Sequence, residues 1–509
     1  METNTAAIEM RNITKRFGPV LANDKVWLNI YRGEILALLG ENGSGKTTLM
    51  NMLSGIYFPD EGEIKIDGKE VVIRSPKDAF DNGIGMIHQH FKLVDVLTAA
   101  ENIVLGLPGK LDLKAASAKI REICDKYGFS VDPTQKIYDM SVSQKQTVEI
   151  VKVLYRGADI LILDEPTAVL TPQETDKLFA VLRNMRNDGK AIVIITHKMH
   201  EVEALSDRVA ILRHGQFIGD MLTKDTNAQE MTNMMVGHAV SLNIERPDPV
   251  DPKPRIEVKG LTVRSVDGII KLDDVSFTAN SGEILGIAGI SGCGQKELLE
   301  AIAGLQTVES GSISYIEDDG SREELVGKDP LSIAELGVSL SFVPEDRLGM
   351  GLVGNMNLAD NMMLRSFRRG KSIFTDRRSP RALAESVVQE LSVSTPSVDT
   401  PVRRLSGGNV QKVLVGREIA SAPTVLLTAY AVRGLDIHSS YTIYDLINRQ
   451  KKAGVAVIFV GEDLDVLLEL CDRILVLCGG KVSGIVPGRG AEKREVGMMM
   501  TKLGGQSHE

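Results

Sequence analysis

A glycine-rich segment near the N-terminus has the residue types needed to hold phosphate groups. It runs from Gly40 to Thr47 as GENGSGKT and fits the spacing G-x-x-x-x-G-K-[ST]. Glycines let successive backbone N–H groups curl around a phosphate, and the N-terminus of a following helix favours negative charge. Lys46 is expected to reach the outer phosphates and the Thr47 hydroxyl to bind Mg²⁺. A simple turn would not need this Lys-Thr pair. The predicted phosphate-binding residues are Gly40, Glu41, Asn42, Gly43, Ser44, Gly45, Lys46, Thr47 and Thr48.

Two adjacent acidic residues stand at the end of an apolar run. The run extends from Ile160 to Leu163, and Asp164 and Glu165 follow it. Carboxylates at the end of a buried run are costly unless they have a function. We predict that Asp164 binds Mg²⁺ through water and that Glu165 orients or deprotonates an attacking water.

Two further polar residues follow other apolar runs. Gln89 comes shortly after the run 84–87 and is predicted to contact both metal and water. His197 follows the run 191–195. A lone histidine is usually structural, but one at a neighbouring strand end can sense the outermost phosphate of a nucleotide. These residues and the glycine loop together predict a site that hydrolyses a nucleoside triphosphate.

The predicted strands and helices that carry these residues indicate an α/β fold. The runs 160–163 and 191–195 are continuously apolar, as in strands of a parallel sheet that is covered on both faces. The segment 47–55 is predicted to form a helix after the glycine loop, with Leu49 and Leu53 facing inward. Strands ending in functional residues, each followed by an amphipathic stretch, predict a sheet with helices against it.

The chain contains two copies of one plan. The segment 33–40, GEILALLG, returns as GEILGIAG at 282–289, and SDRV at 206–209 returns as CDRI at 471–474. Between the copies, 245–254 contains four prolines alternating with polar residues, which cannot continue a helix or pair into a central strand. We therefore predict a first domain at 1–244, a semi-rigid linker at 245–254 and a second domain at 255–509.

These motifs carry a resemblance to a known family. Gly40–Thr47, Gln89, Asp164-Glu165 and His197 resemble the Walker A, glutamine loop, Walker B and switch histidine of ABC-transporter nucleotide-binding domains. Residues 405–409, LSGGN, resemble the signature loop of that family. The resemblance covers nearly the whole chain and implies two ABC-type ATPase domains, each with a mixed sheet core and a helical subdomain. It implies that ATP is the nucleotide, with Mg²⁺, and that Ser406, Gly407, Gly408 and Asn409 contact it.

The second copy lacks the residues that could do this chemistry. Its glycine loop carries a lysine one place late and no hydroxyl for the metal, and its strand ends carry other side chains. None of them can replace the metal ligand or the base, so the second copy is expected to hydrolyse ATP little or not at all. Lys46 corresponds to Gln295, Thr47 to Lys296, Asp164 to Ala429, Glu165 to Tyr430, His197 to Glu462 and Gln89 to Glu345.

The signature loops are degenerate in the opposite sense. The first copy has MSVSQ at 140–144, without the two central glycines, whereas the second keeps Ser406 to Asn409 intact. In the family, each nucleotide lies between one domain's phosphate loop and its partner's signature loop. We therefore expect the two domains to pair head to tail within the chain, forming one competent and one degenerate site. If the two copies had changed independently, an intact phosphate loop would be expected to face a degenerate signature loop as often as an intact one.

One aromatic residue is a candidate for the nucleotide base. The ring of Phe17 is predicted to stack on adenine, and Val266 corresponds to it in the second copy. A single aromatic residue near a strand is also typical of a buried core, so both interpretations of Phe17 stay open.

Composition narrows the class of protein. The chain has 509 residues, is 43% hydrophobic and 25% charged, and has a net charge of −9. A negative chain argues against a protein that coats nucleic acid. No apolar run approaches the ~18 residues of a membrane span, and no signal peptide is expected at the N-terminus. The four cysteines are scattered without a C-x-x-C pair, which is typical of reduced thiols.

The tandem of two such domains in one chain is similar to the ATP-binding subunits of ribose, galactose and nucleoside importers. This resemblance implies two separate transmembrane permease subunits, an extracytoplasmic substrate-binding protein and a place at the cytoplasmic face of the membrane. Segments 88–91 and 429–434 resemble the nucleoside branch, and a simple-sugar importer is the alternative. A soluble tandem ABC protein acting on ribosomes or DNA is a third interpretation, for which the basic segment 365–381 would be the contact. No nucleic acid is expected.

Overall fold

The chain folds into two compact units, residues 1–241 and 242–509. The computed structural model describes residues 6–89, 91–109, 112–168, 170–237, 244–265, 267–290, 292–367 and 375–501. His90, Val266 and residues 368–374 of the basic segment therefore lie outside the described residues.

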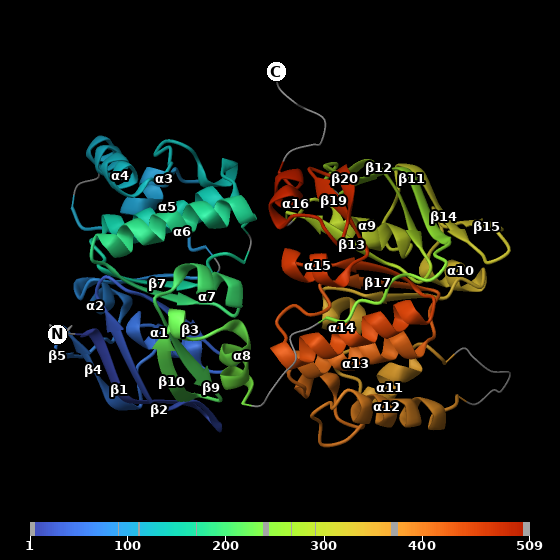
Figure 1. Ribbon diagram of the computed structural model, residues 1–509, viewed down its shortest axis with the longest axis horizontal. Helices are drawn as coiled ribbons and strands as arrows, with labels where there is room; N and C mark the ends of the chain where they lie inside the picture. The colour runs from blue at the N-terminus through green and yellow to red at the C-terminus, as the bar shows by residue number, and fades with distance from the viewer. Residues whose placement is uncertain are drawn as a thin grey trace. The chain divides into compact units, whose positions relative to one another are not determined.

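A six-stranded central sheet of order β10-β9-β3-β8-β7-β6 organises the first unit (Figure 1). Neighbouring strands are parallel except β10, which is antiparallel to β9. All residues of β7 and β8 are buried, as predicted for strands covered on both faces. Because the carboxyl ends of parallel strands share one edge, the segments after β3, β6, β7 and β8 meet there. The strands are β3 (Ile35–Leu39), β6 (Ile84–Ile87), β7 (Ile160–Asp164), β8 (Ala191–Ile195), β9 (Arg208–Arg213) and β10 (Gln216–Leu222).

A second, antiparallel sheet of order β2-β1-β4-β5 covers one side of this core. Its apolar residues share a cluster with the first helix and with one face of the central sheet. The strands are β1 (Ala6–Phe17), β2 (Val20–Tyr31), β4 (Glu61–Ile66) and β5 (Lys69–Val71).

Helices cover the other face and form a separate subdomain. Apolar residues of α5 and α6 pack on the central sheet, while α3, α4 and α5 share a smaller cluster of their own (Figure 1). The predicted α/β class, with a mixed sheet and a helical subdomain, is confirmed. The helices are α1 (Lys46–Leu53), α2 (Pro76–Asp81), α3 (Ala99–Val104), α4 (Leu113–Tyr127), η1 (Ile137–Asp139), α5 (Val142–Tyr155), α6 (Pro172–Asn187), α7 (Met199–Leu205), η2 (Thr223–Asp225) and α8 (Ala228–Val236).

The second unit repeats this plan. Its central sheet has the order β16-β17-β18-β13-β19-β20 and its antiparallel sheet the order β12-β11-β14-β15. The strands are β11 (Pro254–Arg264), β12 (Ile270–Asn280), β13 (Ile284–Gly289), β14 (Ser310–Ile316), β15 (Arg322–Glu324), β16 (Leu340–Val343), β17 (Val425–Ala429), β18 (Ala456–Val460), β19 (Arg473–Cys478) and β20 (Lys481–Pro487). The helices are α9 (Gln295–Ile302), α10 (Pro330–Glu335), η3 (Arg347–Gly351), α11 (Leu358–Met363), α12 (Arg378–Glu390), η4 (Val402–Arg404), α13 (Gly407–Ala420), α14 (Ile437–Lys452), α15 (Leu464–Leu470) and α16 (Lys493–Met499).

The proline-rich segment packs against the second unit. The Arg246 guanidinium donates to the Leu468 carbonyl at 3.0 Å, and the amide of Asn448 donates to the Glu245 carbonyl at 2.7 Å. Pro254 is already the first residue of β11, a position at which a strand tolerates proline. Residues 244–253 thus form a strap on the surface of the second unit.

The basic segment offers fewer available cations than its sequence indicates. Arg365 forms an ion pair with the fully buried Glu418, and Arg381 forms one with Asp399 at 2.7 Å. These two arginines are therefore occupied within the unit. Throughout the described ranges, no helix is both long and apolar enough to cross a membrane.

Candidate functional site

The glycine loop after β3 is shaped by its close neighbours. Gly45 has φ of 96° and caps the N-terminus of α1. A Cβ added there would lie 2.3 Å from the carbonyl oxygen of Ala22, so only glycine fits. The helix begins at Lys46, one residue before its predicted start at Thr47. The N–H groups of the first turn are left free for an anion.

Lys46 folds back across the loop. Its Nζ donates to the Gly40 carbonyl at 2.6 Å and to the Glu41 carbonyl at 2.9 Å, and the side chain is buried. Burial lowers the pKa of Lys46 to about 8, against the opposing attraction of Glu165 and Asp164. A phosphate bound beside Lys46 would offset the cost of burying its charge and would raise its pKa.

Thr47 and Asp164 meet where the loop approaches the end of β7. The Thr47 hydroxyl donates to Asp164 Oδ2 at 3.3 Å. Asp164 is 8% exposed, and burial together with the Glu165 charge raises its pKa to about 6. A hydroxyl and a carboxylate are hard oxygen ligands that suit Mg²⁺.

These residues fit a magnesium ion that is completed by other ligands. Among the described residues, no group of three His, Cys, Asp or Glu side chains could hold a metal alone. Mg²⁺ usually keeps several waters and takes oxygens from substrate phosphates. Thr47 and Asp164 would hold the ion here, with Gln89 nearby, and the ion would neutralise charge on the phosphates.

Glu165 lies between the two other predicted polar residues. Gln89 Nε2 donates to Glu165 Oε2 at 2.9 Å, and His197 Nδ1 lies 3.1 Å from Glu165 Oε1. The hydrogen bond to His197 is the main cause that lowers the Glu165 pKa. The carboxylate is therefore ionised at neutral pH and can accept a proton from water. Glu165 has φ of 48°, a rare conformation that turns the chain sharply at the end of β7.

Sequence reasoning missed a buried network behind this group. Glu201, 3% exposed, accepts hydrogen bonds from the hydroxyls of Thr167 and Thr196, the second at 3.0 Å, and pairs with Lys198 at 3.2 Å. It thereby ties the turn after Glu165 to the loop that carries His197. The sequence places Glu201 four residues after His197. The helix α7 begins between them, at Met199, and turns the Glu201 side chain back towards the end of the strand.

The raised pKa of Asp164 predicts a pH-dependent effect on stability. Asp164→Asn is expected to increase the free energy of unfolding of the metal-free first unit at pH 8 by about 3 kcal/mol, because two pKa units correspond to about that energy. The folded pKa of about 6 lies above the unfolded value of about 4. The cost of ionising the buried carboxylate is therefore fully present above pH 6 and vanishes by about pH 4. Urea unfolding across this range measures it.

An aspartate with the opposite shift provides the control. Asp188 accepts hydrogen bonds from Lys126 at 2.7 Å and Tyr127 at 2.6 Å, which lower its pKa. Asp188→Asn is therefore expected to reduce stability at pH 8 instead of increasing it. A gain for Asp164→Asn that persists at pH 4, or no gain at pH 8, would contradict the assignment.

Phe17 lies at the end of β1 and is 41% exposed. The interpretation of Phe17 as a core residue is therefore wrong. Its ring packs edge-on against Tyr57 with 5.1 Å between centroids, so Tyr57 joins it as a second exposed aromatic residue that sequence reasoning missed. Stacking on adenine stays a prediction.

In the second unit, the glycine loop keeps its shape and loses its cation. Gly294 has φ of 98° and caps α9, as Gly45 caps α1. Gln295 takes the place of Lys46, is buried, and donates to the Ile290 carbonyl at 3.1 Å. The Lys296 side chain is exposed on the surface of α9, and its Nζ lies 3.7 Å from Glu300 Oε1. A neutral amide therefore fills the position that the Lys46 ammonium occupies in the first unit.

The strand ends of the second unit carry a different constellation. Tyr430 keeps the unusual backbone of Glu165, with φ of 53°. Burial raises its pKa to about 12, so the phenol is neutral. The Arg433 guanidinium forms ion pairs with Glu345 and, at 2.9 Å, with Glu462. Ala429, which corresponds to Asp164, has no side-chain atom that could bind a metal.

The two signature segments both begin helices. Ser406 caps α13 and accepts a hydrogen bond from the Asn409 backbone N–H, while Ser141 caps α5 in a reciprocal box with Gln144. A Cβ added at Gly408 would come no closer than 3.7 Å to other atoms, so the fold does not require glycine there. Gly407 and Gly408 add no side chain to the first turn of α13, so their backbone N–H groups can face an anion.

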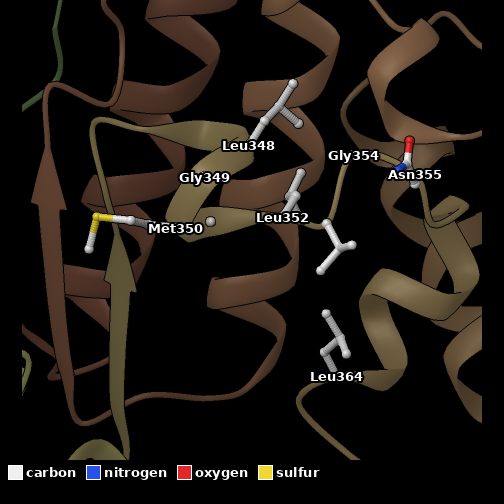
Figure 2. Close-up of a pocket in the computed structure, with 9 residues that line it drawn as sticks. Leu348, Gly349, Met350, Leu352, Gly354, Asn355 and Leu364 are labelled. Carbon is white, nitrogen blue, oxygen red and sulfur yellow. The ribbon is translucent and has the colours of Figure 1, made fainter.

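A pocket of about 430 Å³ lies apart from the glycine loops (Figure 2). It is formed by the segment after β16 and by Leu364. Figure 2 shows Leu348, Leu352 and Leu364 together on one side of the segment, whereas the Met350 side chain extends the other way. The pocket is lined by apolar side chains and also by the polar backbone of the glycine-containing segment and by Asn355. It belongs to the second unit and includes none of the residues of the polar constellations.

Comparison with known proteins places these features in a family. The family model described as ABC transporter matches residues 23–168 and 272–428. The nucleoside import ATP-binding protein NupA of Lactococcus lactis is 42% identical over 99% of this chain and 100% of its own. The guanosine import ATP-binding protein NupO of Bacillus subtilis is 41% identical over 97% of both chains. The glucose import ATP-binding protein TsgD13 of Haloferax volcanii is 39% identical over 98% of this chain and 96% of its own.

Each matched segment contains a glycine loop and a signature segment and extends into the strand that follows it, β7 or β17. The chain therefore belongs to the ABC transporter family, as a tandem of two ATP-binding domains.

Proposed function

We propose that this chain is the ATP-hydrolysing subunit of an importer and that it hydrolyses ATP at one competent site. The observation that carries this proposal is the group Gln89–Glu165–His197 beside Lys46 and the Thr47–Asp164 pair in the first unit. The corresponding positions of the second unit hold an amide, an alanine, a phenol and an arginine–carboxylate cluster. Hydrolysis is therefore assigned to the first unit alone.

The roles within the site follow from the contacts. Lys46 and the N–H groups of the glycine loop hold the phosphates, and Phe17 stacks on the adenine. Thr47 and Asp164 would hold Mg²⁺, which would neutralise charge on the phosphates when bound. Glu165 takes a proton from the attacking water, Gln89 helps to place that water, and His197 keeps Glu165 ionised and faces the outermost phosphate.

The signature residues Ser406, Gly407, Gly408 and Asn409 complete this site through head-to-tail pairing of the two units. The crossed degeneracy supports the pairing: the intact loop of one unit matches the intact signature of the other. Closing on ATP and reopening after hydrolysis would then move attached permease subunits between two states.

The partners are two transmembrane permease subunits, served by an extracytoplasmic binding protein, with this chain at the cytoplasmic face of the membrane. Exposed apolar side chains after β6 and β16 support two such contacts. They are Val94, Val96, Leu105 and Leu107 in the first unit and Leu348, Met350, Val353 and Phe367 in the second. Contiguous apolar patches mark interaction sites, and we propose that the exposed apolar side chains of each unit contribute to one permease contact.

Nucleosides are the proposed cargo. The names of NupA and NupO, the nucleoside and guanosine import proteins, support this choice. A simple sugar is the alternative, supported by the glucose import relative. The residues that select cargo lie in other subunits, so the ATPase itself gives only this indirect support.

Affinity purification of a tagged Glu165→Gln chain with ATP, from detergent-solubilised membranes, tests the proposal. Two multi-span proteins are expected to co-purify. Calorimetric titration of the associated binding protein with guanosine, adenosine, ribose and glucose then identifies the cargo. Ribosomes or nucleic acid in place of membrane proteins would overturn the importer assignment, and binding of sugars alone would overturn the nucleoside cargo.

A further inference from the structure

Two arginines of the second unit connect its degenerate strand ends to its signature loop. Arg433 lies between the carboxylates of Glu345 and Glu462, with its guanidinium 5.9 Å from the centre of the Tyr430 ring. Arg347 Nη2 donates to the backbone carbonyl of Arg433. Arg433 therefore joins the two carboxylates, which its side chain contacts, to the Arg347 guanidinium, which its main chain contacts.

Arg347 also contacts the signature loop directly. Its Nη1 donates to the Gly407 carbonyl at 3.3 Å. A Cβ added at Gly407 would lie 3.2 Å from the same Nη1, so glycine here lets the guanidinium approach the helix start. A continuous set of contacts thus runs from Glu345 and Glu462 through Arg433 and Arg347 to residues 406–409.

The first unit has none of these side chains. At the offsets that align β6 with β16 and β7 with β17, Arg347 corresponds to Phe91 and Arg433 to Ala168. Gly407 corresponds to Val142. The arginines are therefore present in the copy with the intact signature and absent from the copy whose signature is degenerate.

Stability does not account for the arrangement. The side chains of Arg433, Glu345 and Glu462 are 51%, 37% and 44% exposed. Exposed ion pairs contribute only about 0–1 kcal/mol to folding because water and salt screen them. These contacts therefore contribute little to the stability of the unit. Their main consequence is that they hold the signature loop in one position.

We propose that Arg347 and Arg433 are positioning residues that hold the signature loop for ATP hydrolysis at the first unit's site. The proposal rests on the head-to-tail pairing proposed above. Placing the N–H groups of Gly407 and Gly408 against phosphate charge that develops during reaction is worth most in the transition state. Loss of either arginine is then felt in kcat, while ATP is still held by Lys46 and the glycine loop.

Steady-state ATP hydrolysis by the purified full chain tests this inference. Arg347→Ala and Arg433→Ala are each expected to lower kcat about tenfold with little change in KM. Because both act through the same loop, the double variant is expected to be no slower than the more impaired single variant. Arg449→Ala is the matched control, since its ion pair with Asp445 lies on the exposed surface of α14.

The outcomes separate this inference from the pairing itself. Melting temperatures check folding, and Arg347→Gln serves as a second variant if an alanine variant unfolds. Unchanged kcat in folded Arg347 and Arg433 variants, a change in KM alone, or additive effects would overturn the positioning role. If Gly408→Asp also leaves hydrolysis unchanged, the pairing fails; if Gly408→Asp is inactive while the arginine variants are normal, only this inference fails.

Discussion

Glu165→Gln is expected to reduce ATP hydrolysis by the full chain at least about a hundredfold while ATP binding persists. A general base commonly contributes a factor of 10² to 10⁴, and the amide cannot accept the proton that Glu165 takes from water. The side chain keeps its length and can still bond to Gln89 or His197, which lie 2.9 and 3.1 Å from the carboxylate. Lys46 and the glycine loop are untouched. Phosphate release gives the rate, and equilibrium binding of a fluorescent ATP analogue gives the affinity.

The second unit provides the control for this experiment. Tyr430 stands at the corresponding strand end with the same positive φ, and Tyr430→Phe removes only its hydroxyl. We expect the rate to stay within about twofold of the parent, because the hydroxyl has no assigned part in turnover. Normal hydrolysis by Glu165→Gln would show that another residue is the base. Loss of hydrolysis in Tyr430→Phe would show that the second unit contributes directly to chemistry.

Much of the site's geometry was predictable because it depends on short-range patterns. The loop from Gly40 to Thr47 and the polar residues after β6, β7 and β8 are local signals. The parallel sheet then brings these strand ends together without further information. The same reasoning located the substitutions of the second unit, since its elements recur in the same order.

The remaining contacts depend on tertiary geometry. Glu201 is one acidic residue among many in the sequence, and its role as a tie between two loops exists only once α7 packs. The ion pairs of Arg433 likewise join residues that are 88 positions apart in one case. The exposure of Phe17 could not be decided from sequence, because edge strands and core strands both contain isolated aromatic residues.

Glycine at position 408 has a cost that the fold does not explain. Glycine in a helix is about 1 kcal/mol less favourable than alanine, and a Cβ at this position would make only ordinary contacts, at 3.7 and 3.8 Å. An acidic residue in the first turn of α13 would even stabilise the helix through its dipole. The glycine is therefore better explained by the close approach of something outside the unit, and phosphate oxygens at the bare helix N-terminus would be such a group.

Gly408→Asp is consequently expected to abolish hydrolysis while leaving the second unit folded with a melting temperature close to that of the parent, because the gain from the helix dipole is offset by the Asp436 carboxylate, whose Oδ2 lies 3.8 Å from the position of the new Cβ. The introduced carboxylate would face the phosphates of ATP bound by the first unit, and its charge would oppose closure. Ser143→Asp, the corresponding change in the degenerate signature of the first unit, is expected to keep most of the rate because no hydrolysis is assigned to the site it faces. Phosphate release and melting curves of both variants measure the two properties separately. Equal loss in both variants would mean that the sites are not divided as proposed, and full activity in Gly408→Asp would mean that the intact signature does not serve Lys46 and Glu165.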